Sequence, residues 1–247
     1  NRDNILVFAE GTNDKFPFTY HQHNSFWVDI LNYNLRKPTI THSDKEKDFL
    51  ILVGEDDANR IKIVKGLEEK QLLDQSLVSV NSPTYDCVYK LEEQYDWKEF
   101  NSSTDRYSKE TRIPFPPQYE TTKFSLVMET VVEEGSYQLS EKSYKPIIAE
   151  HPFVIFGPKG FLKYLRSKGF QTFGDYIDES YDEEENVDKR IQKIIELCEH
   201  LKNIDYKEFY AQTKNIRESN RKLFFNEQAV SKPNTEALNI VNHFFST

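Results

Sequence analysis

Short, continuous apolar runs recur along this chain and are separated by segments with helical periodicity. Uninterrupted apolar runs are typical of strands buried on both faces of a sheet. These runs are residues 49–54, 77–80, 124–130 and 152–156. Residues 57–73 and 140–150, which lie between runs, carry apolar side chains at helical spacing and predict amphipathic helices. Strands and helices that alternate in this way predict an open α/β sheet with parallel strand pairs.

The remaining segments are less regular. Residues 4–10 predict a short strand, and residues 101–122 are Pro-rich and predict an extended connection. A helix is expected over residues 161–168, followed by a fifth strand at 170–173. The remaining predictions are an acidic, solvated loop at 178–185, a mixed and partly helical segment at 86–100, and helices at 188–201, 205–225 and 235–245.

This pattern divides the chain into three parts. Residues 1–47 predict a short N-terminal lobe, and residues 48–230 a Rossmann-like lobe built on the parallel sheet. Residues 231–247 contain the Lys232-Pro233 break and predict a C-terminal helix that packs back on the N-terminal lobe.

Composition excludes several classes of protein. The 247 residues carry 32 basic and 41 acidic side chains, a net charge of -9, which does not favour general attraction to nucleic acid. No apolar run is long enough to span a membrane, and no secretory leader opens the chain. The two cysteines, Cys87 and Cys198, predict free thiols rather than a disulfide framework. We therefore expect a cytoplasmic protein.

The strongest chemical signal is Ser140-Glu141-Lys142 at the start of a predicted helix, with Lys145 one turn later. A helix N-terminus favours anions because its first N–H groups lack intrahelical partners and its dipole is positive there. The lysines add charge for phosphates, and Glu141 is suited to accept hydrogen bonds from a ribose diol. These residues predict a nucleoside-diphosphate pocket. A plain N-cap at Ser140 is the alternative interpretation.

Two further residues join this candidate site. Glu129 ends a predicted strand, at the sheet edge where ligands bind in open parallel sheets. Arg60 follows the first strand of the lobe, where a guanidinium can clamp a pyrophosphate. The alternative for Arg60 is a surface ion pair with Glu55 or Asp56. No metal site is predicted, because His21 and His23 lack partners that would complete a ligand set.

The order of these motifs resembles a group of glycosyltransferase-like proteins of large DNA phages, other viruses and bacteria. The similarity lies in Glu129-Thr130, the helix start at residues 140–147, the strand leading into Gly157-Pro158-Lys159-Gly160, and residues 169–182. The chain also resembles, more distantly, the donor-binding half of the alpha-1,3-fucosyltransferases. The resemblance implies the two-lobed GT-B architecture, with Glu141 on the donor ribose and Lys142 and Arg60 on the diphosphate.

The implied activity is metal-independent transfer of a sugar from a nucleoside-diphosphate sugar to an acceptor hydroxyl. The acceptor is a glycan, a protein or a modified base of phage DNA, and the location is the host cytoplasm if the protein is viral. Glu10, His21 and His23 are the candidates for the base that accepts the acceptor's proton. A catalytically inactive binding module with the same fold is the main alternative. A nucleotide hydrolase or metal phosphatase is a third. The pattern predicts no oligomeric state.

Overall fold

The computed structural model describes residues 7–9, 20–22, 44–54, 57–80, 116–137 and 139–225. The predicted helical segment at 86–100, the predicted C-terminal helix at 235–245 and most of the N-terminal segment 1–47 lie outside these residues. The predicted packing of the C-terminal helix on the N-terminal lobe therefore also lies outside the described residues. Two short strands are described in the N-terminal segment, β1 (Val7–Ala9) and β2 (Tyr20–Gln22), and they pair in parallel.

The centre of the protein is a four-stranded parallel sheet in the order β4-β3-β5-β6. Each strand coincides with one of the apolar runs, so this part of the α/β prediction is confirmed. The strands are β3 (Lys47–Val53), β4 (Leu77–Val80), β5 (Thr122–Met128) and β6 (Phe153–Phe156).

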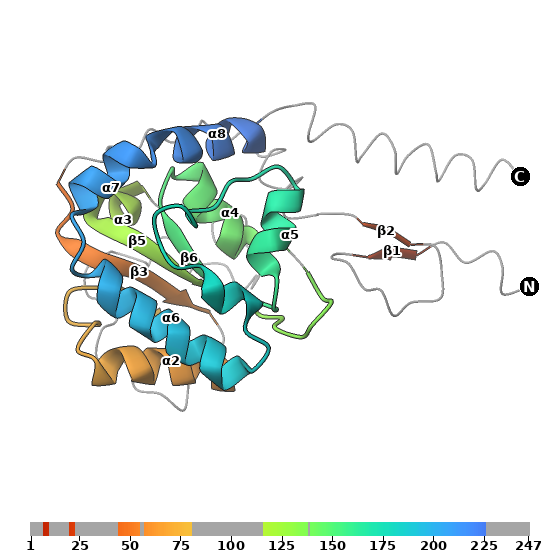
Figure 1. The fold of residues 1–247 in the computed structure, drawn as a ribbon, viewed down its shortest axis with the longest axis horizontal. Helices are drawn as coiled ribbons and strands as arrows, with labels where there is room; N and C mark the ends of the chain where they lie inside the picture. Colours follow the sequence, from red (N-terminus) through yellow and green to blue (C-terminus); the bar gives the residue numbers. More distant parts are fainter. Residues whose placement is uncertain are drawn as a thin grey trace, which may run out of the picture.

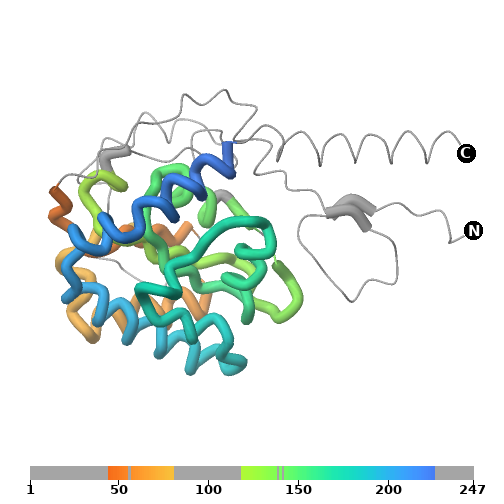
Figure 2. Tube along the Cα trace, turned by 45° about the horizontal axis from the view of Figure 1, so that its top comes forward, coloured from red at the N-terminus to blue at the C-terminus, as the bar shows by residue number. Residues whose placement is uncertain are grey.

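Helices cover both faces of this sheet (Figure 1). Helices α2 and α6 lie side by side on one face, and α4 and α8 contact each other on the opposite face; the tube in Figure 2 shows the same two layers. The described α-helices are α2 (Ala58–Glu69), α3 (Pro116–Thr121), α4 (Glu141–Ile148), α5 (Phe161–Ser167), α6 (Val187–Leu201), α7 (Tyr206–Gln212) and α8 (Lys214–Phe224).

Alternating side chains of β3 face two different environments, as the pleat of a strand requires. Phe49, Ile51 and Val53 belong to the main apolar core, which includes the inner faces of α2 and α6. Leu50 belongs to a smaller cluster with Tyr119, and the partly buried Leu52 packs against that cluster. The smaller cluster lies next to the candidate site described below.

The connections diverge between the two central strands. Strand β3 leads through α2 to β4 on one side, and β5 leads through α4 to β6 on the other. In open α/β sheets a ligand site commonly forms at such a point, outside the carboxyl ends of the strands. Here those ends are followed by Gly54 after β3 and Glu129 after β5.

Several predicted elements are wrong in this structure. Residues 170–173 are not a strand; Phe170 and Phe173 are buried core side chains on an irregular segment. Residues 116–121 form α3, because proline is well tolerated in the first turn of a helix. The predicted helix at 205–225 is divided into α7 and α8 at Thr213, whose hydroxyl donates to the carbonyl of Phe209.

The acidic segment 178–185 is also more ordered than the solvated loop that was predicted. It contains the 3-10 helix η5 (Ser180–Glu183), in which Tyr181 and Asp182 are buried. The Asp182 carboxylate accepts hydrogen bonds from the backbone N–H groups of Leu162 and Lys163, at 2.9 and 3.3 Å. Asp182 therefore caps the N-terminus of α5 from a distant part of the chain. Burial raises the pKa of this carboxyl, while the two backbone hydrogen bonds act in the opposite direction.

Candidate functional site

The first turn of α4 is fixed by a buried carboxylate at the end of β5. Ser140 is the N-cap of α4, and its Oγ accepts a hydrogen bond from the Lys142 N–H at 3.2 Å. The same hydroxyl donates to Glu129 Oε2 at 2.6 Å, and the hydroxyl of Ser143 donates to Glu129 Oε1 at 2.5 Å. Glu129 is only 4% exposed, so these charge-assisted bonds form away from water. Glu129 thus links the start of α4 to the end of β5.

The other end of α4 is held by two arginines of α8. Arg221 Nη1 donates to the carbonyl of Ile148, and Arg217 Nη1 donates to the carbonyl of Glu150 at 3.1 Å. The last carbonyl groups of a helix have no intrahelical partners, so Arg221 satisfies an acceptor that α4 leaves open, and Arg217 holds the turn that follows. Helix α4 is therefore anchored at both ends, and its orientation on the sheet is well defined.

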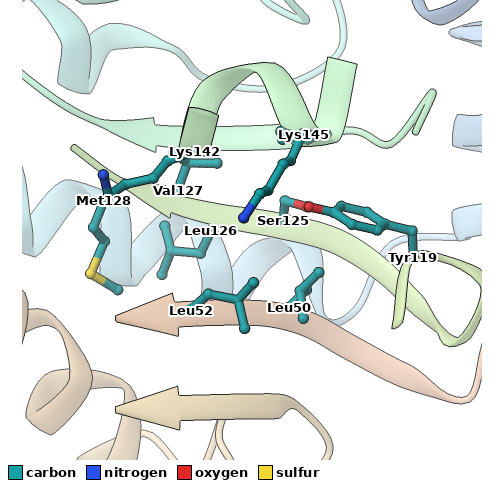
Figure 3. Close-up of a pocket in the computed structure, with 10 residues that line it drawn as sticks. Leu50, Leu52, Tyr119, Ser125, Leu126, Val127, Met128, Lys142 and Lys145 are labelled. Atoms are coloured by element: carbon teal, nitrogen blue, oxygen red, sulfur yellow. The ribbon is translucent and has the colours of Figure 1, made fainter. Parts of the chain in front are cut away.

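Lys142 and Lys145 lie along one wall of a small pocket between α4 and the sheet (Figure 3). Lys142 stands near Met128 at the end of β5, whereas Lys145 reaches over Ser125 in the middle of the strand. The pocket has a volume of about 50 Å³. The residues that line it are Leu50, Leu52, Tyr119, Ser125, Leu126, Val127, Met128, Lys142, Lys145 and Pro146.

Two ammonium groups that line a largely apolar pocket can attract an anion into it, because charges interact more strongly where water is partly excluded. Typical sites for drug-sized ligands enclose about 300–1,000 Å³. The pocket volume of about 50 Å³ is therefore sized for a single phosphate-like group rather than for a complete nucleotide sugar. The backbone N–H of Lys142 already donates to Ser140 Oγ, so this donor at the start of α4 is not open to an anion.

Arg60 reaches the same edge of the sheet from α2, where its side chain is buried. It is 2% exposed, and its Nη2 donates to the carbonyl of Met128 at 3.1 Å and to Thr130 Oγ1 at 2.8 Å. The guanidinium therefore ties the start of α2 to the segment that follows β5. Its burial differs from the surface position that the alternative interpretation assumed.

The structure brings together five of the predicted site residues around the carboxyl end of β5 and the start of α4. These are Arg60, Glu129, Ser140, Lys142 and Lys145. The backbone of Glu141 begins α4, but its side chain lies outside the described residues. Glu10 and His23 lie wholly outside the described residues, and only the backbone of His21, in β2, is described. The proposed roles of these residues stay predictions.

Sequence reasoning missed three polar side chains at this pocket. Ser125 and Tyr119 line it, and the buried His151, which is not among the lining residues, hydrogen-bonds to Ser125. Burial raises the pKa of Tyr119 well above its usual range, so its hydroxyl stays protonated. Ser125 sits inside an apolar run and His151 between a helix and a strand, so only the three-dimensional contact reveals them.

The Gly157-Pro158-Lys159-Gly160 turn does not need a ligand to explain its glycines. A Cβ on Gly157 would lie 2.9 Å from Cγ of the buried Phe161 ring. Gly160 has a φ of 80°, the left-handed conformation that glycine adopts most readily, and it is the N-cap of α5. Packing and backbone geometry therefore account for both positions.

Within the described parts of the chain, no three His, Cys, Asp or Glu side chains gather closely enough to hold a metal ion. None of the helices in those same parts is both long and apolar enough to cross a bilayer.

Comparison with known proteins gives little further information. No known protein family matches the chain, and no curated protein is similar to it. Among solved structures, it is similar to a crystal structure of an alpha1,3-fucosyltransferase, with 13% sequence identity and a TM-score of 0.31. That match covers 82% of this chain and 52% of the fucosyltransferase, so this chain spans about half the length of that protein. A likeness at this TM-score carries no argument about fold or activity.

Proposed function

We propose that this chain is the donor-binding part of a glycosyltransferase with GT-B-like architecture. It would use a nucleoside-diphosphate sugar and transfer the sugar to an acceptor hydroxyl. The observation that carries the proposal is the pair Lys142 and Lys145, which line one pocket beside the point where the sheet connections diverge. The sequence resemblance of this region to glycosyltransferase-like proteins supports the same assignment.

In this proposal the pocket holds a phosphate of the donor. As the bond to the sugar breaks, negative charge grows on the leaving diphosphate, and the two ammonium groups offset it. Preorganised charges act strongly in such a role because they need no rearrangement as the reaction proceeds. The anchoring of α4 by Glu129, Arg217 and Arg221 supplies that preorganisation. Metal independence is part of the proposal, since the lysines would take the role of a divalent cation.

The small pocket favours one second candidate, a binding module without transferase activity. A volume of about 50 Å³ accommodates a phosphate group alone. A module that recognises a phosphorylated ligand would need no more than this. Incubation with nucleoside-diphosphate sugars and a panel of glycan acceptors separates the two candidates. Transfer of sugar supports the enzyme, and diphosphate binding without transfer or donor hydrolysis supports the module.

The binding step is tested by titration calorimetry with uridine and guanosine diphosphates. Lys142→Ala and Lys145→Ala should each weaken binding about 10- to 100-fold, because a hydrogen bond to a charged group contributes about 1.5–3 kcal/mol. Lys65→Ala is the matched control, since Lys65 is an exposed lysine on α2 that does not line the pocket. Absence of diphosphate binding, or equal affinities in all three variants and the native protein, would overturn the proposal.

A further inference from the structure

One hydrogen-bonded chain at the pocket has no role in the proposed donor site. It runs from the hydroxyl of Ser125 through the imidazole of His151 to the backbone of Thr122. Ser125 Oγ lies 2.8 Å from His151 Nδ1, and His151 Nε2 lies 2.7 Å from the Thr122 carbonyl oxygen. His151 is 1% exposed, so this chain is shielded from solvent on the side away from the pocket.

These distances determine which nitrogen of the neutral imidazole carries hydrogen. A carbonyl oxygen can only accept a hydrogen bond, so Nε2 must be the N–H that donates to Thr122. Nδ1 then presents its lone pair and accepts the hydroxyl hydrogen of Ser125. The histidine is therefore held as a hydrogen-bond acceptor, and a potential base, behind the serine oxygen.

We propose that Ser125 and His151 form a nucleophile and base pair that opens on the pocket and accepts small acyl groups. The arrangement has the three parts that an activated nucleophile needs: a hydroxyl, a base in hydrogen-bond contact, and a third group that orients the base. The orienting group here is the Thr122 carbonyl. This activity would require no nucleotide, but it would use the same pocket as the donor phosphate proposed above, so the two ligands would compete for it.

The size and charge of the pocket set the class of substrate. One water-sized group needs about 10–15 Å³. A volume of about 50 Å³ therefore has room for an acetyl-sized group and little more. Lys145 reaches over Ser125, where its ammonium would offset the charge that develops on a carbonyl oxygen under attack (Figure 3). Small activated esters fit these limits.

The transfer of the acyl group to Ser125 needs no cofactor. Ser125 Oγ forms a bond to the carbonyl carbon while its proton passes to His151 Nδ1. When the tetrahedral intermediate collapses, the bond to the leaving alkoxide breaks and that oxygen takes the proton from His151. The product is an ester of Ser125, which water can later hydrolyse by the same route.

The test uses methanesulfonyl fluoride, a small reagent that sulfonylates activated serines and releases fluoride. We expect one sulfonyl group per chain, located on Ser125 by peptide mass spectrometry. Ser125→Ala should abolish the label, and His151→Gln should slow labelling at least about 100-fold, since a general base contributes about 10²–10⁴ in rate. Ser76→Ala should leave labelling unchanged, because Ser76 is a buried serine whose hydroxyl donates to a backbone carbonyl and not to a base.

Because His151→Gln can fail to fold, a second measurement uses the native sequence alone. The folded protein should be labelled at Ser125, and the urea-unfolded protein should not. A folded protein without label on Ser125 would overturn the proposal and leave His151 as a purely structural link between strands. Labelling at the same rate in the unfolded chain would overturn it equally.

Discussion

Several buried cationic side chains of this protein end on backbone carbonyl groups rather than on carboxylates. Lys45, which is 5% exposed, donates from Nζ to the carbonyls of Tyr119 and Glu120, at 2.7 and 3.2 Å. Arg190 donates to the carbonyl of Gly157 in the same manner. A buried charge is tolerated only when it is well partnered, and carbonyl groups at the ends of helices and strands supply such partners. Each of these hydrogen bonds links segments that are distant in the sequence.

The first prediction concerns how the free energy of unfolding depends on pH through Lys45. Burial lowers the pKa of Lys45 to about 7, and the nearby charge of Arg217 acts in the same direction. In the unfolded chain the pKa is about 10.4, so above pH 7 the unfolded chain binds a proton that the folded protein has lost. The free energy of unfolding must then rise with pH. Between pH 7 and 8.5 we expect a gain of about 2 kcal/mol from this group.

Urea unfolding at a series of pH values measures this gain as the difference between the native protein and Lys45→Met. The slope of unfolding free energy against pH is compared between the two proteins, because the loss of the two hydrogen bonds to carbonyls lowers stability equally at every pH. Lys65→Met removes an exposed charge and serves as the control, with a slope equal to that of the native protein. Parallel slopes for the native protein and Lys45→Met would show that burial does not lower the pKa of Lys45.

Residue types alone do not show which charges are buried. The sequence does not show that Arg60 and Lys45 are buried while Lys62 and Lys65 are exposed, because the partners of the two buried residues come from distant segments. Arg60 meets Met128 and Thr130, and Lys45 meets the end of α3. The lysines at residues 142 and 145 were easier to predict, since they belong to one helix start with its own local signal.

Helix α4 shows how an element can be oriented by contacts at its two ends. The serines of its first turn bond to Glu129, and its last carbonyls bond to α8. A plain N-cap at Ser140 was the alternative interpretation of the sequence, and Ser140 is the N-cap of α4 in the structure. The partner of that cap could not be predicted, because Glu129 is eleven positions earlier and was interpreted as a ligand residue.

The second prediction tests this anchoring through Glu129. Glu129→Ala removes two charge-assisted hydrogen bonds, each contributing about 1.5–3 kcal/mol, so we expect a loss of about 3–6 kcal/mol in unfolding free energy. Glu129→Gln keeps an acceptor for one serine and a donor for the other, and should cost less than Glu129→Ala. Chemical denaturation measures both values. If the two variants are equally stable, Glu129 does not hold α4 through its carboxylate.

The third prediction concerns the turn between β6 and α5. A Cβ at residue 157 would lie 2.9 Å from Cγ and 3.2 Å from Cβ of Phe161, which is fully buried. Gly157→Ala should therefore cost about 1–3 kcal/mol through overpacking. The cost should shrink in a Phe161→Leu background, where the ring is absent, and a double-mutant cycle measures that coupling. Diphosphate affinity should stay unchanged, because packing and not ligand approach explains this glycine. Additive effects of the two substitutions would contradict this explanation.

At the scale of the whole molecule, hydrophobic periodicity was enough to predict a parallel sheet with alternating helices. The four buried strands are nearly uniform apolar runs, and this signal is local. The secondary structure predicted from the sequence is wrong where aromatic side chains reach the core from irregular segments. Phe170 and Phe173 produced an apolar run without a strand. The site was predicted in part because the end of β5 and the start of α4 are close in sequence, whereas Ser125 and His151 meet only in three dimensions.

The last prediction follows from the charge of the whole chain and bears on the acceptor. With 41 acidic and 32 basic side chains the protein repels a polyanion at long range, which opposes the electrostatic attraction that dominates non-specific DNA binding. At a salt concentration of about 150 mM we expect duplex DNA to bind more weakly than a Kd of about 100 µM. Fluorescence anisotropy with a labelled duplex measures this affinity, and uridine diphosphate in the same buffer serves as the anion that should still bind. Micromolar DNA affinity that weakens steeply with added salt would instead indicate a concentrated basic groove, and would favour a DNA base over a glycan as the acceptor.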